Sequence, residues 1–188
     1  ASVKSMLKDA LILFIITVIA GAALGYVYNV TKEPIALAEE AAAKEAYSEV
    51  FPTASDFKEI ASDLDDNNAS EWKSAGYGSI SVDKVLDACD SEGAVYGYVL
   101  LVTTKEGYGG DITFAMGIAN DGTLNAMSIL TISETAGLGM RAEEVLKPQF
   151  ASKKVPQFTV TKTGSLEDSQ IDAISGATIT SDAITNGV

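Results

Sequence analysis

The feature that most constrains this chain is a segment near its N-terminus, Ala10 to Thr31, that contains no charged residue. A helix that crosses a membrane needs about 20 predominantly apolar residues, and this segment is long enough. A secretory signal peptide has an apolar region of only about 7–15 residues before a small-residue cleavage site. Tyr26 and Tyr28 also lie where the aromatic belt of a membrane interface is expected. We therefore predict a retained transmembrane helix over residues 10–31.

Positive charge is distributed unevenly around this predicted helix. Lys4 and Lys8 precede it, whereas Lys32 follows it and is offset at once by Glu33. Because segments rich in Lys and Arg stay on the cytoplasmic side of a membrane, residues 1–9 are predicted to be cytoplasmic. Residues 32–188 are then predicted to form an extracytoplasmic domain on a single-pass anchor.

Composition excludes several classes of function. The chain has 26 Asp and Glu against 13 Lys and Arg, and its formal net charge of -13 argues against nucleic acid as a partner. It has no His, so a Ser-His-Asp triad and imidazole metal ligands are absent. Cys89 is the only cysteine, so a metal cluster held by several thiolates cannot form within the chain. We expect Cys89 to be a small residue of the core. No metal site is expected, and any redox chemistry must use an organic cofactor.

The segment after the predicted span favours helices. An Ala- and Glu-rich stretch is predicted to form a helix that begins at Pro34 and is closed by Pro52. A second helix is predicted over Ser55–Leu64, followed by a loop at Asp65–Asn68. Residues 80–86 fit either a short strand or a short helix, and the sequence leaves that choice open.

From Ala94 onward, β-branched and aromatic residues favour strands. The Asp121-Gly122 pair is a strong hairpin signal between two such runs. Three consecutive antiparallel strands are predicted, over residues 94–104, 112–119 and 123–132. A helix is expected over residues 141–146, ending near Pro148, and a further strand is expected over residues 158–162. The absence of βαβ alternation predicts one α+β domain, an antiparallel sheet with packed helices behind the transmembrane helix.

A Gly-rich loop, Glu106 to Asp111, separates two of the predicted strands. By itself it is typical of a hairpin loop whose glycines adopt positive φ angles. The alternative is a place where backbone approaches a flat ligand and Tyr108 provides a stacking face. The loop is not a dinucleotide-binding fingerprint, because no helix follows it and the glycine spacing differs.

A second loop, Ser133 to Met140, joins a predicted strand to a predicted helix. Gly137 and Gly139 leave backbone N–H groups able to point at an acceptor, and Thr135 adds a hydroxyl. The alternative is an ordinary strand-to-helix turn with a capping residue.

A third segment, Asp172 to Ser181, surrounds the hydroxyl of Thr178 with small residues. From the residues alone it predicts an exposed turn that enters a C-terminal helix, with Ser181 as the N-cap. A hydrolase that uses Thr178 as its nucleophile is disfavoured, because no His or other general base lies nearby in the sequence.

The segment DAISGAT, Asp172 to Thr178, resembles the Asp-x-x-Ser/Thr-Gly-Ala-Thr acceptor motif of the FMN-binding domain family. In that family a flavin transferase, using FAD, links FMN through its phosphate to the last Thr of the motif. The resemblance implies that Thr178 carries the FMN as a phosphoester. It also implies that Asp172, Ser175, Gly176 and Ala177 form the sequence that the transferase recognises.

The same resemblance implies non-covalent flavin contacts in the two earlier loops. These residues are Tyr108, Glu134, Thr135, Gly137, Leu138 and Gly139. Ala136 and Asp111 stand where the family usually has Pro, which suggests slightly looser loops and removes no group that bonds flavin.

The order of the motifs extends the resemblance over nearly the whole chain. A single N-terminal span, a Gly-Tyr-Gly-Gly loop and a Glu-Thr-x-Gly-Leu-Gly loop precede the acceptor motif, as in the family. The chain is most similar to the G subunits of Rnf electron-transport complexes, which are ion-translocating ferredoxin:NAD oxidoreductases. The related alternative is the C subunit of the sodium-translocating NADH:quinone reductase, which is usually longer.

This resemblance implies an electron-transfer protein that is not catalytic alone, in the bacterial inner membrane, with its flavin domain on the outer or periplasmic side. The implied partners are other subunits of the complex, including a D subunit with its own covalent FMN, and a flavin transferase during maturation. The alternative is a membrane-tethered extracytoplasmic binding or sensing domain without covalent flavin. No nucleic acid is expected as a partner.

Overall fold

The computed structural model describes residues 3–62 and 65–188, and the chain divides into two compact units, one up to Ala42 and one from Ala43 onward. The first unit consists of most of helix α1 (Val3–Val50). Four consecutive side chains in it, Leu11 to Phe14, are 45–65% exposed, so the helix is apolar on every side. Among the described residues, α1 is the one helix long and apolar enough to cross a membrane.

Pro34 lies inside α1, so the prediction of a separate helix that begins there is wrong. Proline removes one backbone hydrogen bond, here to the carbonyl of Val30, and the turns on either side continue the helix in spite of this loss. The predicted end is confirmed, because α1 ends at Val50, two residues before Pro52.

A five-stranded antiparallel sheet forms the centre of the second unit, in the order β1-β2-β3-β4-β5. The predicted strands and the hairpin at Asp121-Gly122, where Gly122 has φ +84°, are confirmed. The open choice at residues 80–86 is resolved as a strand. The strands are β1 (Asp56–Ser62), β2 (Ile80–Cys89), β3 (Val95–Thr104), β4 (Ile112–Ala119) and β5 (Leu124–Thr131).

The predicted helix over Ser55–Leu64 is wrong where the structure describes it, since residues 56–62 form the edge strand β1; residues 63–64 lie outside the described part. Pairing with β2 overrides the helix propensity of Lys58 and Glu59. The predicted loop at Asp65–Asn68 is also wrong, because α2 (Asp65–Ser74) begins there.

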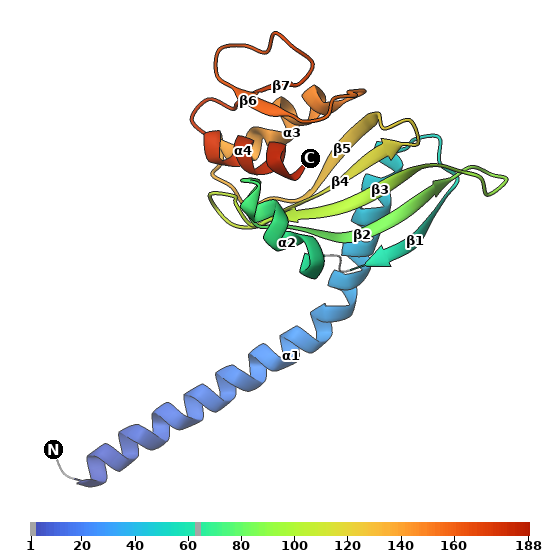
Figure 1. Ribbon diagram of the computed structural model, residues 1–188. Helices are drawn as coiled ribbons and strands as arrows, with labels where there is room; N and C mark the ends of the chain where they lie inside the picture. The colour runs from blue at the N-terminus through green and yellow to red at the C-terminus, as the bar shows by residue number, and fades with distance from the viewer. Residues whose placement is uncertain (1–2, 63–64) are drawn as a thin grey trace. The chain divides into compact units, whose positions relative to one another are not determined.

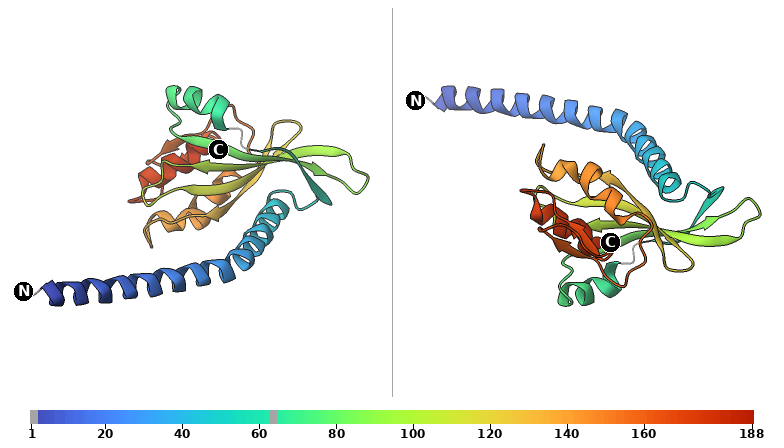
Figure 2. Two further views of the ribbon diagram at one scale, coloured as in Figure 1. Left: turned by 90° about the horizontal axis from the view of Figure 1, so that it is seen from below. Right: turned by 90° about the horizontal axis from the view of Figure 1, so that it is seen from above.

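Short helices cover one face of the sheet (Figures 1 and 2). In both views of Figure 2, α4 (Thr178–Gly187) lies between α2 and α3 (Ala142–Val145). The predicted helix over 141–146 is confirmed as α3, although 3-10 turns flank it: η1 (Gly139–Arg141) and η2 (Lys147–Phe150), which contains Pro148. The predicted strand at 158–162 is β6 (Thr159–Thr161), and it pairs in parallel with β7 (Gln170–Asp172).

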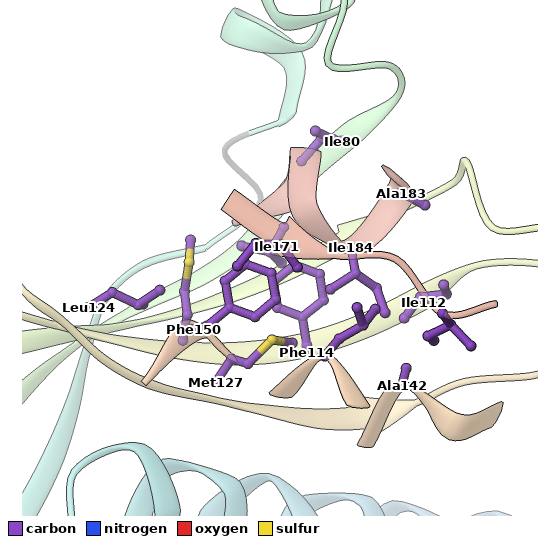
Figure 3. Close-up of a cluster of buried hydrophobic side chains, with 14 of the residues drawn as sticks. Ile80, Ile112, Phe114, Leu124, Met127, Ala142, Phe150, Ile171, Ala183 and Ile184 are labelled. Carbon is purple, nitrogen blue, oxygen red and sulfur yellow. The ribbon is translucent and has the colours of Figure 1, made fainter. Parts of the chain in front are cut away.

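The larger hydrophobic core lies between the sheet and this layer of helices. Phe114 of β4, Phe150 of η2, Ile171 of β7 and Ile184 of α4 are fully buried and meet in the centre of it (Figure 3). Segments far apart in the sequence therefore depend on one another for burial. The predicted α+β class, with an antiparallel sheet and packed helices, is confirmed.

A smaller core lies on the other face of the sheet, beneath the end of α1. Tyr47 and Val50 of α1 and the following Phe51 pack against Val99 and Ala115 of the central strands. Cys89 is 1% exposed, so its predicted place in the core is confirmed.

A charged network joins the end of α1 to β5 and η2. Glu49 accepts a hydrogen bond from Ser128 at 2.5 Å and pairs with Lys147 at 2.6 Å, and Lys147 also pairs with Glu143. Burial alone would raise the pKa of Glu49, but the hydrogen bonds from Lys147 and Ser128 and the charge of Lys147 together lower it. Burial would lower the pKa of Lys147, but Glu143 and Glu49 raise it.

Replacing Glu49 with Gln should lower the free energy of unfolding at neutral pH by about 0.2–1 kcal/mol, the range for partly exposed ion pairs. The folded-state pKa of Glu49 lies below its ordinary value of 4.5. Its stabilising contribution is therefore present above that value and is lost as the pH falls through the lowered pKa. Thermal midpoints of the two proteins, measured between about pH 3 and pH 8, should converge at the acidic end.

The matched control is Glu45→Gln, an exposed position one turn earlier in α1. It should show no such convergence. A deficit of Glu49→Gln that stays constant over the whole pH range would contradict the ion-pair explanation.

Candidate functional site

Thr178 is the first residue of α4 and is half-buried. Within residues 3–62 and 65–188, no hydrogen-bond partner is found for its hydroxyl. The N-cap residue, Ala177, makes no side-chain capping bond, so the first N–H groups of the helix are not satisfied in that way. The start of α4 thus combines a free hydroxyl with the positive end of a helix dipole.

A tight turn presents Thr178. Ala177 N donates to Ile174 O at 3.0 Å, and Gly176 has φ +79°, which a type II turn requires at that position. Ser175 and Gly176 are exposed, so the predicted exposed turn is confirmed. The predicted N-cap role of Ser181 is wrong: it lies in the first turn of α4, where its hydroxyl accepts from Ile174 N and donates to Ala177 O.

The loop between β5 and η1 contains a turn with the same pattern. Leu138 N donates to Thr135 O at 3.1 Å, and Gly137 has φ +76°. Ala136 occupies the second position of this turn, where Pro is also favoured. The turn exposes Thr135 and leaves the Leu138 side chain 40% exposed.

The Gly-rich loop between β3 and β4 lies directly against Glu134. Gly109 N donates to Glu134 Oε1 at 3.2 Å. A Cβ atom at Gly109 would lie 2.1 Å from Ser133 O, and one at Gly107 would lie 2.9 Å from Glu134 Oε1. The absence of side chains at these two positions therefore lets the two loops touch. Tyr108, between them, is 71% exposed.

The loop that contains Glu134 also touches the segment around Thr178. A Cβ atom at Gly139 would lie 2.7 Å from both Glu134 Cβ and Thr180 Oγ1. A Cβ atom at Gly176 would lie 3.1 Å from Leu138 Cδ2. The structure therefore brings together three segments that lie far apart in the sequence, and the loop that contains Glu134 contacts both of the others.

Sequence reasoning missed several residues of this cluster. Met140 is 43% exposed and Ile179 is 53% exposed, each next to a predicted site residue, and Thr180 is buried against Gly139. Leu138, Met140 and Ile179 are thus exposed apolar side chains in the two segments that meet here. An apolar residue directly after the acceptor Thr is the one signal that could have indicated Ile179.

Asp172 lies apart from the other predicted residues. It is in β7, where its carboxylate accepts from Ser165 at 3.2 Å and its backbone N donates to Gln149 Oε1 at 2.7 Å. These two hydrogen bonds attach β7 to the segment before it and to η2.

The arrangement fits a phosphorylated ligand bonded to Thr178. A phosphate group at a helix N-terminus is stabilised by free N–H groups and by the helix dipole. The exposed apolar side chains and the Tyr108 ring suit a flat aromatic group. No cluster of three or more Cys, Asp or Glu suited to a metal ion occurs in the part of the chain that the structure describes.

Two family models match the chain. One, described as the RnfG N-terminal region, matches residues 2–50, and the other, described as the FMN-binding domain, matches residues 107–188. The second match includes the Gly-rich loop from Gly107 onward, the loop that contains Glu134, and Thr178.

Relatives match at nearly full length. The G subunit of the Na(+)-translocating ferredoxin:NAD(+) oxidoreductase complex of Acetobacterium woodii is 33% identical, over 98% of this chain and 89% of that protein. The G subunit of the ion-translocating oxidoreductase complex of Methanosarcina acetivorans is 31% identical, over 98% and 92%. Among solved structures, the crystal structure of Shewanella oneidensis NqrC has a TM-score of 0.47 at 16% identity, covering 57% of this chain and 53% of that chain.

Proposed function

This chain belongs to the family of G subunits of ion-translocating ferredoxin:NAD(+) oxidoreductase complexes, and from that premise we propose that it is a membrane-anchored electron-transfer protein with FMN bonded to Thr178. The observation that carries the proposal is the meeting of the Glu134–Gly139 loop with the start of α4. It places the exposed side chain of Leu138 close to the turn that presents the Thr178 hydroxyl, at a helix N-terminus that no side chain caps. The other members of such a complex are its partners.

The covalent step requires a hydroxyl that is accessible and uncommitted. Thr178 meets both conditions, because it is half-buried and its hydroxyl has no partner within the described residues. In a transfer from FAD, a bond would form between Thr178 Oγ1 and the phosphorus of the FMN moiety, the P–O bond from that phosphorus to the AMP moiety would break, and AMP would leave while the hydroxyl proton passes to solvent. A flavin transferase performs this step, with Asp172, Ser175, Gly176 and Ala177 as its recognition sequence.

Bound FMN supplies the redox chemistry, since its ring system takes up and releases one or two electrons. The chain contributes binding and electrostatics. Leu138, Met140 and Ile179 would provide apolar contacts to the flavin, and the Thr135 hydroxyl and the N–H groups of Gly137 and Gly139 would provide hydrogen bonds to it. The tether prevents loss of the cofactor, and the Glu134 carboxylate disfavours further negative charge and so lowers the reduction potential. The sequence has one Cys and no His, so we take FMN as the redox group through which this protein relays electrons to partners such as a flavin-carrying D subunit.

Flavinylation is tested by the mass of the intact chain from cells that contain an active flavin transferase. We expect an increase equal to FMN less one water, localised by fragmentation to the peptide over residues 175–181. Thr178→Ala should abolish the increase, because no other hydroxyl occupies the end of the acceptor motif. Thr163→Ala, at an exposed position outside the motif, is the matched control and should keep it.

Asp172→Ala should lower the modified fraction without removing the acceptor. An unmodified mass of the parent chain from such cells would contradict the proposal. A tethered binding or sensing domain, the second candidate, would then account better for the fold and the membrane helix.

We also propose the topology in which residues 1–9 face the cytoplasm, residues 10–31 cross the inner membrane and residues 32–188 lie outside. The support is the pair Lys4 and Lys8 before an apolar helix that is exposed on every side. Protease added to bacterial spheroplasts should digest residues 32–188 without detergent. Protection of this part until the membrane is dissolved would reverse the assignment.

A further inference from the structure

The hydroxyl of Thr178 is accessible, but much of the segment before it is not. Ala177 is 7% exposed, and Ile174, at the start of the turn, is 1% exposed. A protein that recognises an extended peptide bonds the peptide backbone and receives the side chains in pockets. Within residues 174–178, the folded domain offers such a partner only Ser175, Gly176 and Thr178.

The side chain of Gln149 holds one end of this segment. Its Nε2 donates to Asp172 O at 3.1 Å, and its Oε1 accepts from Asp172 N at 2.7 Å. The same Nε2 donates to Val145 O at 2.7 Å, which attaches the amide to α3. Both backbone groups of Asp172 are thus bonded to a residue of η2.

The side chain of Ser181 holds the other end. Its hydroxyl accepts from Ile174 N at 3.0 Å and donates to Ala177 O at 2.9 Å, and the residue is fully buried. A backbone group that is bonded within the chain has to give up that bond before it pairs with another protein. Two side chains outside the acceptor motif therefore keep it bonded within the domain.

We propose that Gln149 and Ser181 are positioning residues for the acceptor segment, and that the flavin transferase modifies Thr178 only after residues 172–178 have come away from them. This inference rests on the proposed function, and the transfer is the one given above, with FAD as co-reactant and AMP as leaving group. Local opening of a segment requires less free energy than unfolding of the whole domain. Because the transferase binds only the open form, the rate of modification is proportional to the population of that form.

The test uses the full chain, purified without FMN from cells that lack a flavin transferase. Intact mass gives the initial rate of modification by added transferase and FAD, with the chain well below saturation. Gln149→Met keeps the length of the side chain and removes its amide. It should lower the thermal midpoint and yet raise the rate about threefold to tenfold, the factor expected for the loss of one hydrogen bond. Ser181→Ala should change both quantities in the same directions.

Two controls separate local opening from other effects. Gln157→Met is the same change at an exposed position outside the segment and should alter neither quantity. Thr103→Val removes hydrogen bonds to Asp83 and Thr113 in the sheet, so it should lower the thermal midpoint without raising the rate. Hydrogen–deuterium exchange at the Ile174 amide of unmodified Gln149→Met should accelerate by the same factor as the modification.

Three results would overturn the inference. A slower modification of Gln149→Met and Ser181→Ala would mean that the transferase recognises the folded turn. An unchanged rate together with faster exchange at Ile174 would mean that opening does not limit the modification. An equal acceleration in Thr103→Val would mean that unfolding of the whole domain exposes the segment. If the parent chain and every variant stay unmodified, the proposed function itself is contradicted, and this inference with it.

Discussion

The burial of α4 on the sheet determines where the hydroxyl of Thr178 lies. Ala183 and Ile184 are buried in the same cluster as Phe114 of β4 and Ile171 of β7 (Figure 3). Burying one side chain of the size of Ile contributes about 1.5–3 kcal/mol, so the end of the helix is firmly attached. Because a short helix is rigid, its first residue is fixed as well. The hydrophobic core thus positions the residue on which the proposed function depends.

Close approach of backbone completes the site. Gly109 and Gly139 allow contacts with Ser133, Glu134 and Thr180 that a Cβ atom would prevent. These contacts join the β3–β4 loop, the β5–η1 loop and the segment between β7 and α4. Each of these segments is anchored at both ends by a helix or a strand. Loops on a rigid scaffold are where binding residues are usually found, and here the scaffold brings them to one helix terminus.

Part of this could be predicted from the sequence, and the physical reasons differ between elements. Alternation and the Asp121-Gly122 pair indicate β3 to β5 because these signals are local. Strand β1 was not predictable in the same way: Lys58 and Glu59 favour a helix, and only pairing with β2 decides the matter. The Ser181 hydroxyl accepts a hydrogen bond from the backbone N–H of Ile174 instead of capping α4. This bond depends on the turn between the two residues, and the sequence carries no strong local signal for the geometry of that turn.

The central claim is that a flavin on Thr178 lies against both glycine-containing loops. Hydrogen–deuterium exchange, compared between the flavinylated chain and Thr178→Ala, tests it most directly. We expect slower exchange in the modified chain for residues 107–110 and 134–140 as well as at the start of α4. Protection confined to residues 175–180, with both loops unaffected, would contradict it.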